Sequence, residues 1–392
     1  MKIALGIFRL QPAGGLERNA LKLAELLAER GHRVVLHTTV TAQLRPPGVE
    51  IVTVKRTGVT NHAAMKSFSA RFAAATRDFD LVVGFQRFEG LDVLYCADWC
   101  FVDRPRPSWQ RMLPRYRTMA ALERACFARE SATRIIALAA PQLTAYVRAY
   151  GTPPARLAIL PPTIEASWRP SLPPSADRRA SLRARHGLAE RETIWLWVGL
   201  QPQVKGLDRV MAALARRPEA RLMICGVDRT HRQVIELMAP ARRVGLADRI
   251  KLFGLISDHG ELRELFETAD LLIHPARLDV TGTVILEAIV SGLPVIATAN
   301  CGYSPHVSKA GAGIVLPDPF EAAALDQALV EADAARRSIW STNAQAYGRR
   351  PDLYLGLTRA TDLIEAAGQA SDAAWVAAGG LKGPISGDFA IT

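Results

Sequence analysis

Apolar runs and helical patterns alternate from the beginning of the chain. Residues 3–8 (IALGIF) are apolar, residues 16–31 repeat leucine and alanine at helical spacing, and residues 33–39 (RVVLHTT) form a second apolar run. A Gly-Gly step, Gly14 and Gly15, separates the first run from the helical pattern. An amphipathic helix between two apolar runs predicts a βαβ unit with one helix face packed on a parallel sheet.

The same alternation continues and then restarts after a proline-rich stretch. Short apolar runs that predict buried parallel strands stand at 81–85, 93–97, 134–139 and 157–160. Residues 160–179 hold five prolines and show no strong periodicity, which is typical of a connector between domains. Further apolar runs, with helical patterns between them, follow at 193–199, 220–226, 250–254, 271–275 and 294–299.

We therefore predict an α/β protein with two doubly wound halves. Ligands of such sheets bind beyond the carboxyl ends of the strands, so two facing halves would hold a substrate in the cleft between them. The predicted domains span 1–165 and 166–350. A terminal helix is predicted at 351–368, for which a return to the first domain is one arrangement. Residues 369–392 are rich in Gly and Ala and weakly patterned, and are predicted to be a disordered tail.

Composition places the chain among ordinary soluble proteins. Of its 392 residues, 49% are hydrophobic and 22% are charged. No apolar run reaches the roughly 18 residues that a membrane span needs, and Arg9 interrupts the first run too early for a secretory signal. We expect a cytoplasmic protein. The five cysteines form no CxxC pair, which favours free buried thiols over a disulfide framework or a zinc site.

The net charge is +11, and one segment carries a large part of it. Residues 104–129 carry seven arginines against a single acid, Glu123, with aromatic and apolar residues between them. This mixture suits the headgroup region of an anionic membrane, although a solvated basic surface fits about equally well. Nucleic acid is disfavoured because no recognition motif accompanies the charge. The residues that we expect to dock on a membrane are Arg104, Arg106, Trp109, Arg111, Arg115, Tyr116 and Arg117.

The Gly14-Gly15 step is a candidate phosphate contact. A glycine turn before a helix lets the backbone approach a phosphate, and the helix N-terminus favours negative charge. By itself such a step is more often simple turn geometry. It is not the GxGxxG of dinucleotide enzymes, and the run at 33–39 ends without the acid that would bind the ribose of NAD, which disfavours a nicotinamide-dependent oxidoreductase.

Two acids in the stretch 274–294 point to a site. On one helix, Asp279 and Glu287 would be about 80° and ~12 Å apart, too far to share a proton. We therefore predict that Asp279 lies on a loop and that the helix starts near residues 281–283 and ends at Gly292. Such a helix start can hold a diphosphate, while the two acids bind a ribose and a sugar, as in a nucleotide-sugar site. His274, at the end of a strand, is interpreted as a packed polar residue.

An acid followed at the eighth position by Glu, ahead of an EAxxxGxPV run, resembles the donor-site motif of retaining GT-B glycosyltransferases of family 4. The resemblance extends from about residue 3 to about residue 366. Most of the chain is similar to one branch, the lipopolysaccharide core glucosyltransferases that use UDP-glucose. The stretches that carry this likeness include PAGGLERNALKLAELLAERGHRV, VGFQRFEGLDVLYCADWCF, ILPPTI, KGLDR, ADLLIHPA, VILEAIVSGLPV and CGYSPHV.

The resemblance implies a GT-B fold, two Rossmann-like domains facing across a cleft, and a role for each motif residue. Asp98, Lys205 and Asp279 would be catalytic: Asp98 at the acceptor, Lys205 at the donor diphosphate and Asp279 on the transferred hexose. Glu287 would bind the ribose. The other donor-binding positions would be Gly14, Gly15, Thr281, Gly282, Thr283 and Val284. No metal and no cofactor is expected, and the UDP-sugar is the donor substrate.

The implied reaction moves a hexose, with retention, from a UDP-sugar to a heptose of the lipopolysaccharide core. It would take place at the inner face of the cytoplasmic membrane, with the protein bound peripherally. A front-face mechanism, in which the leaving diphosphate accepts the acceptor proton, is favoured because no positioned nucleophile is evident.

Three positions depart from the family pattern. The first acid of the motif is usually Glu and is Asp279 here, which leaves open another UDP-hexose or a UDP-N-acetylhexosamine as donor. Relatives commonly carry an arginine near the lysine, where this chain has Leu200 and Val204, and an Asp where it has Asn19. The alternative that is not an enzyme is therefore a membrane-associated binding protein with a decayed donor site.

Overall fold

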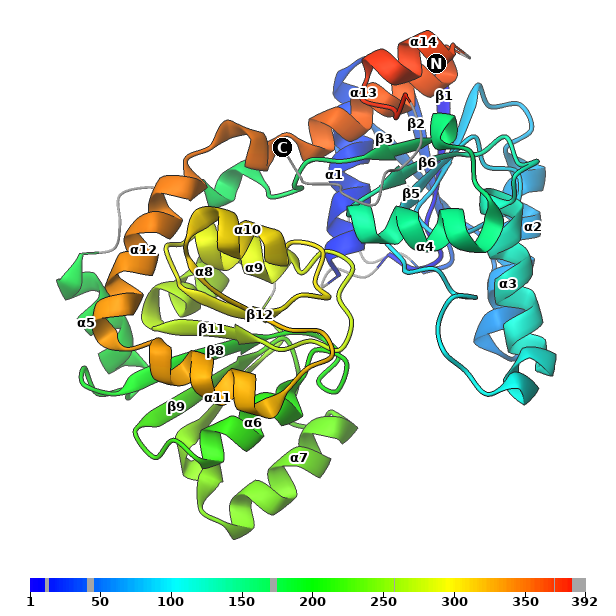
Figure 1. Ribbon diagram of the computed structural model, residues 1–392. Helices are drawn as coiled ribbons and strands as arrows, with labels where there is room; N and C mark the ends of the chain where they lie inside the picture. Colours follow the sequence, from blue (N-terminus) through cyan, green and yellow to red (C-terminus); the bar gives the residue numbers. More distant parts are fainter. Residues whose placement is uncertain (11–13, 41–45, 170–174, 257, 370, 383–392) are drawn as a thin grey trace. The chain divides into compact units, whose positions relative to one another are not determined.

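The computed structural model describes residues 1–392 except 11–13, 41–45, 170–174, 257, 370 and 383–392. The chain forms two compact units, and each contains one twisted parallel sheet with helices on both faces (Figure 1). The first unit comprises residues 1–163 together with the chain from Leu355 onward, and the second comprises Ile164–Tyr354. Within the described part of the chain, no helix is long and apolar enough to cross a membrane.

The first unit is a seven-stranded sheet in the order β3-β2-β1-β4-β5-β6-β7, in which all neighbouring strands are parallel. Its strands are β1 (Lys2–Gly6), β2 (Arg33–Thr38), β3 (Val49–Thr53), β4 (Leu81–Gly84), β5 (Val93–Cys96), β6 (Arg134–Ala137) and β7 (Leu157–Ile159). Its helices are α1 (Gly15–Glu29), α2 (Asn61–Ala75), α3 (Pro114–Phe127), α4 (Ala140–Tyr150), α13 (Gly356–Gly368) and α14 (Asp372–Ala377). Helices α2, α3 and α4 share one apolar cluster with the sheet, whereas α1 packs against α13. The strands predicted from the apolar runs in this half are confirmed.

The second unit is a six-stranded parallel sheet in the order β10-β9-β8-β11-β12-β13. Its strands are β8 (Thr193–Val198), β9 (Ala220–Cys225), β10 (Ile250–Gly254), β11 (Leu271–His274), β12 (Val295–Thr298) and β13 (Gly313–Leu316). Its helices are α5 (Ala176–Arg185), α6 (Leu207–Ala215), α7 (Arg232–Arg243), α8 (His259–Thr268), α9 (Thr283–Val290), α10 (Ser304–Ala310), α11 (Ala322–Glu331) and α12 (Ala334–Gly348).

Strand β8 shows why the apolar runs of this unit are continuous rather than alternating. Ile194 and Leu196 belong to the cluster formed with α8, α9, α10 and α12. Trp195 and Trp197 belong to the cluster formed with α6, α7 and α11 on the other face. Because successive side chains of a strand point to opposite faces, a strand covered by helices on both sides must be apolar throughout.

All five cysteines are free and buried, as predicted. Burial raises the pKa of the Cys96 and Cys126 thiols to about 12, although the nearby Arg87 guanidinium acts in the opposite direction. Thiols of this kind remain protonated at neutral pH and are poor nucleophiles.

The prediction of a disordered tail from residue 369 is wrong for the part of the tail that the structure describes. Helix α14 begins at a capping hydroxyl, Ser371, and contacts α13. Trp375 is fully buried, and the Arg134 guanidinium lies 5.1 Å from its ring centroid. The Leu381 N–H then donates to the Leu157 carbonyl at 2.9 Å, beside an antiparallel bridge from Gly380 to β7. Composition missed this segment because one aromatic side chain supplies most of its burial.

We expect Trp375→Ala to lower the free energy of unfolding by about 3–5 kcal/mol, because it removes a fully buried aromatic ring. Urea unfolding of the full chain, followed by circular dichroism, measures the change. Trp109→Ala is the matched control, since that ring is 56% exposed, and should change stability by less than about 0.5 kcal/mol. Equal effects of the two substitutions would contradict the docked tail.

Candidate active site

Lys205 and Asp279 stand on either side of the point where the second sheet reverses its winding. The chain builds β8, β9 and β10 outward in one direction, then returns to place β11 on the other side of β8. Lys205 lies in the loop after β8, and Asp279 lies in the loop after β11. In open α/β sheets such a reversal leaves a crevice beyond the carboxyl ends of the strands, where ligands bind.

A glycine allows these two loops to approach closely. Gly206, next to Lys205, has a φ of +73°, and a Cβ at this position would lie 2.1 Å from the Pro275 carbonyl oxygen. The Arg277 N–H donates to the Val204 carbonyl at 2.7 Å, which joins the two loops through their backbones. Only glycine fits this approach, so the KG dipeptide places the lysine beyond the carboxyl ends of the strands.

Asp279 is held by three donors. The Lys205 ammonium lies 2.6 Å from Oδ2, and His274 Nε2 lies 2.8 Å from the same oxygen. The Gly282 N–H donates to Oδ1 at 3.0 Å. The carboxylate side chain is 12% exposed. The sequence prediction that Asp279 lies on a loop is confirmed, and the structure brings it together with Lys205.

The charge of Asp279 is stabilised despite its burial. Burial raises the pKa of this carboxyl. The hydrogen bond from His274 and the nearby Lys205 ammonium lower the pKa by more, so that it lies well below its usual range. Asp279 is therefore a carboxylate at neutral pH and is a hydrogen-bond acceptor only.

The helix predicted after Asp279 is α9, and its start lies where the sequence placed it. Gly282 is its N-cap in the left-handed region, with φ 72° and ψ 49°, and the helix begins at Thr283. The first N–H groups of a helix have no acceptor within it, so those of Thr283 and Val284 are available to an anion. Glu287 lies one turn further on and is 6% exposed. The helix ends at Val290, and Gly292 follows with a positive φ.

The Gly-Gly step of the first unit begins α1 directly. Gly14 is the N-cap residue, in an extended conformation, and Gly15 is the first helical residue. The Glu17 carboxylate lies against Gly14, where an added Cβ would be 1.7 Å from one of its oxygens. Burial raises the pKa of Glu17. The turn before Gly14, residues 11–13, lies outside the described residues.

Asp98 follows β5 of the first unit and is half exposed, at 48%. Its carboxylate accepts from Arg87 Nη2 at 2.9 Å. Its backbone carbonyl accepts from Gln142 Nε2 at 2.9 Å and from the Tyr146 hydroxyl at 3.1 Å, so α4 fixes the backbone here. The side chain is thus oriented by a buried arginine while part of it remains accessible.

Glu123 is the buried partner of the same arginine. It is fully buried, ion-paired with Arg87, and accepts from the N–H groups of Phe101 and Val102 at 2.7 and 3.1 Å and from the Tyr150 hydroxyl at 2.9 Å. The single acid of the arginine-rich segment therefore lies in the interior. The outer face of this segment is more basic than the sequence pattern suggests.

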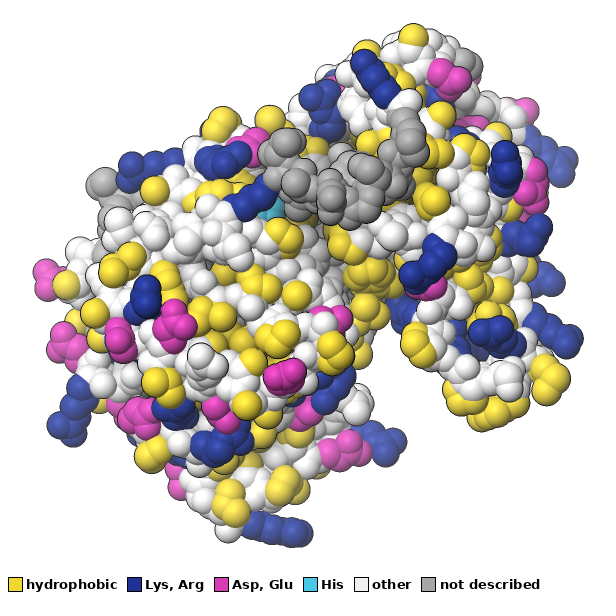
Figure 2. Space-filling model, viewed as in Figure 1, with side chains coloured by type: hydrophobic (Ala, Val, Ile, Leu, Met, Phe, Trp, Pro, Cys, Tyr) yellow, Lys and Arg dark blue, Asp and Glu magenta, His cyan; other side chains and the backbone are white. Residues whose placement is uncertain are grey.

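The arginine-rich segment presents exposed apolar side chains together with its charge. It spans a short 3₁₀ helix (Ser108–Met112) and α3. Trp109, Met112 and Leu113 are 56, 65 and 43% exposed. Hydrophobic side chains gather at this end of α3, next to Lys and Arg side chains (Figure 2).

Two predicted members of the docking set have inward contacts. The Arg106 guanidinium lies 4.0 Å from the Phe101 ring centroid and donates to the Phe101 carbonyl, and Tyr116 packs on the same ring. The members that the structure leaves exposed are Arg104, Trp109, Arg111, Arg115 and Arg117.

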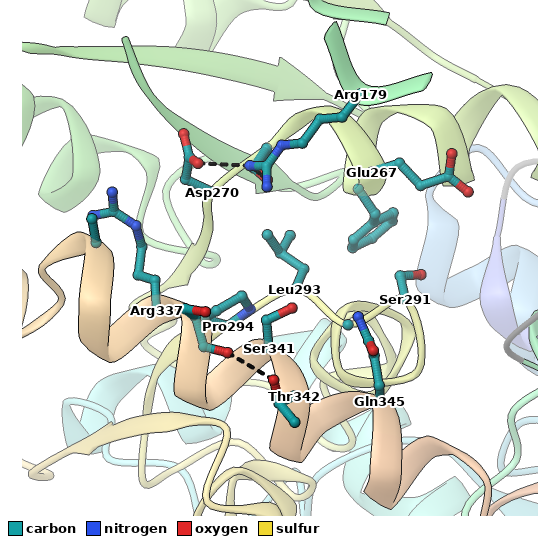
Figure 3. Close-up of a pocket in the computed structure, with 15 residues that line it drawn as sticks. Arg179, Glu267, Asp270, Ser291, Leu293, Pro294, Arg337, Ser341, Thr342 and Gln345 are labelled. Atoms are coloured by element: carbon teal, nitrogen blue, oxygen red, sulfur yellow. Dashed lines mark hydrogen bonds and ion pairs between the residues drawn. The ribbon is translucent and has the colours of Figure 1, made fainter. Parts of the chain in front are cut away.

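A cavity of about 320 Å³ in the second unit lies away from Lys205 and Asp279. It is lined by residues of α5, α8 and α12 and by the turn between α9 and β12, including Leu293, Ser291 and the Arg179–Asp270 ion pair at 2.6 Å (Figure 3). Asp270 precedes β11 and Pro294 precedes β12, so the cavity lies at the amino edge of the strands. Lys205 and Asp279 follow the carboxyl edge, which is where α/β sheets bind substrates.

Comparison with known proteins agrees with this architecture. Residues 13–168 match the family model "Glycosyltransferase Family 4", and residues 178–347 match "Glycosyl transferases group 1". The chain is 33% identical to the lipopolysaccharide glucosyltransferase WaaG of Escherichia coli K12, over 93% of this chain and 98% of that protein. It is 27% identical to a D-inositol 3-phosphate glycosyltransferase of Xylanimonas cellulosilytica, over 86% and 88% of the two chains.

Solved structures give the same result. The crystal structure of WaaG superimposes with a TM-score of 0.86 at 32% identity, covering 92% of this chain and 99% of that one. Anabaena HepE in complex with UDP-glucose has the same fold, with a TM-score of 0.72 at 19% identity, covering 92% and 98%. The predicted family and fold class are confirmed. The chain has two Rossmann-like units and is similar over nearly its full length to the glucosyltransferase WaaG. It therefore belongs to glycosyltransferase family 4 and is a GT-B glycosyltransferase.

Proposed function

We propose that the protein transfers glucose from UDP-glucose to a heptose of the lipopolysaccharide core, with retention of configuration. The observation that carries the proposal is the 33% identity, over nearly the whole of both chains, to a lipopolysaccharide glucosyltransferase. The intact Lys205–Asp279 pair beyond the carboxyl ends of the strands argues against the alternative of a decayed donor site.

Donor binding in this proposal uses the start of α9. The N–H groups of Thr281, Thr283 and Val284 and the Lys205 ammonium would bind the diphosphate, and Glu287 would bind the ribose. The Gly282 N–H donates to Asp279 Oδ1 and would hold that carboxylate beside the donor. Gly14 and Gly15 would be further contacts of the diphosphate. Asp279 would accept hydrogen bonds from the hexose hydroxyls. These contacts need no cofactor.

Lys205 would also act in the chemical step. When the bond between the hexose and UDP breaks, negative charge accumulates on the diphosphate. A cation and helix N–H groups that are already in place stabilise this charge without reorganisation during the reaction. Asp98, oriented by Arg87, would hold the acceptor hydroxyl, whose proton passes to the leaving diphosphate.

A donor panel tests the proposal. UDP-glucose, UDP-galactose and UDP-N-acetylglucosamine would each be mixed with the purified full chain and heptose-bearing lipopolysaccharide core. We expect transfer with UDP-glucose. Preference for another UDP-sugar would correct the donor, and absence of both transfer and donor hydrolysis across the panel would overturn the proposed function.

We expect Lys205→Ala to lower kcat by about 10²- to 10³-fold, because the leaving diphosphate loses its cation. Steady-state transfer assays measure this effect. Lys66→Ala, at an exposed position on α2, is the charge-matched control and should be unaffected. In a parallel thermal-shift titration, UDP at 100 times its dissociation constant should stabilise the wild type by about 2.7 kcal/mol. Wild-type rates in the Lys205 variant would contradict its assigned role.

We also propose that the arginine-rich segment docks the protein on an anionic membrane at the cytoplasmic face. Exposed guanidinium groups beside Trp109, Met112 and Leu113 combine charge attraction with apolar side chains that can enter the headgroup region. A lipid-linked acceptor would make such docking useful, since it brings the enzyme to its substrate.

Neutralising the exposed arginines should weaken binding to vesicles rich in anionic lipid. Each arginine near such a surface contributes about 1 kcal/mol to the binding free energy. Changing four arginines to Gln should therefore weaken binding by up to ~4 kcal/mol at low salt. Co-sedimentation at rising salt measures the effect. The four positions are Arg104, Arg111, Arg115 and Arg117, and the charge-matched controls are Arg77, Arg229, Arg242 and Arg243. Binding that ignores salt, or equal loss in both quadruple variants, would contradict docking through this segment.

A further inference from the structure

We propose that His274 is a positioning residue that holds the Asp279 carboxylate in place while Lys205 engages the donor diphosphate. The inference rests on the proposed function and concerns the same site. His274 is the last residue of β11, is 1% exposed, and is paired in register with Ala297 of β12. Its Nε2 lies 2.8 Å from Asp279 Oδ2.

The two partners of Oδ2 differ in how firmly they are fixed. Lys205 reaches Asp279 from a loop through a flexible side chain that is 23% exposed. His274 reaches it from a buried strand with a short, rigid ring. An anionic diphosphate competes strongly for the ammonium because that hydrogen bond is charge-assisted, whereas a neutral imidazole offers it no charge. When Lys205 turns to the donor, His274 and the Gly282 N–H still hold one oxygen each.

The hydrogen-bonding pattern fixes the tautomer that this role needs. A carboxylate only accepts hydrogen bonds, so the shared proton must be on Nε2 of His274. Nδ1 is buried, and no hydrogen-bond partner for it occurs among the described residues. A second N–H at that atom would be an unsatisfied buried donor, and it would charge a ring that shares Asp279 Oδ2 with the Lys205 ammonium. The neutral form with hydrogen on Nε2 avoids both costs.

A pair of amide substitutions separates this role from simple packing. In His274→Gln the side-chain amide nitrogen reaches the place of Nε2, whereas in His274→Asn it takes the place of Nδ1 and falls short of Asp279. Both variants keep a neutral polar side chain in the same buried site. We expect the Gln variant to retain kcat to within about tenfold and the Asn variant to lose about 10²-fold, as for a displaced catalytic group.

Two further readouts sharpen the test. UDP lacks the hexose that Asp279 would bind, so UDP affinity by calorimetry should be equal in the wild type and both variants. If the Asn variant does not fold, His274→Met replaces it, because Met matches Gln in length but has no donor. Equal kcat in the Gln variant and in Asn or Met would overturn the positioning role while leaving the proposed function intact. A wild type inactive with every donor would instead overturn the function and, with it, this role.

Discussion

The ion pair between Lys205 and Asp279 is the interaction on which the candidate active site depends. A buried ion pair does not stabilise a protein by its charges alone, because both ions lose their hydration. Here the carboxylate also accepts from His274 and from the Gly282 N–H, so each of its oxygens is satisfied. Removing any one partner would leave a largely buried charge less well compensated, so the four groups depend on one another.

The Lys205–Asp279 pair exists because two loops about seventy residues apart in the chain meet where the second sheet reverses its winding. The positive φ of Gly206 and its contact with the Pro275 carbonyl allow no side chain at this point. Two hydrogen bonds, at 2.7 Å each, then join the Arg277 guanidinium to the Asp208 carboxylate and tie the loop after β11 to the start of α6. The rigidity of the site thus comes from backbone approach and from a pair that takes no part in the proposed chemistry.

The sequence predicted the parts of this arrangement that are local. Apolar runs predicted the strands, and the Thr-Gly-Thr step predicted the start of α9, because caps and periodicity are short-range properties. The contact of His274 with Asp279 was missed, since a histidine at a strand end carries no periodic signal and its partner is fixed by a loop. Glu123 was counted with the surface charge for a similar reason: this residue of α3 is paired with Arg87, which lies in the loop between β4 and β5. The docked tail depends on Trp375, whose pocket is formed by residues far away in the chain.

Asp279, which stands where the family usually has the longer Glu, is surrounded by three hydrogen-bond donors that limit what else it can bind. A carboxylate has about four acceptor positions, and three of them are occupied by Lys205, His274 and the Gly282 N–H. While these three donors are in place, little acceptor capacity remains for a sugar. On the proposed function, a diphosphate at the start of α9 draws the ammonium away and releases an acceptor position on Oδ2 for a hexose hydroxyl. Recognition of the sugar would then follow recognition of the diphosphate, because the same lysine serves the two parts of the donor in turn.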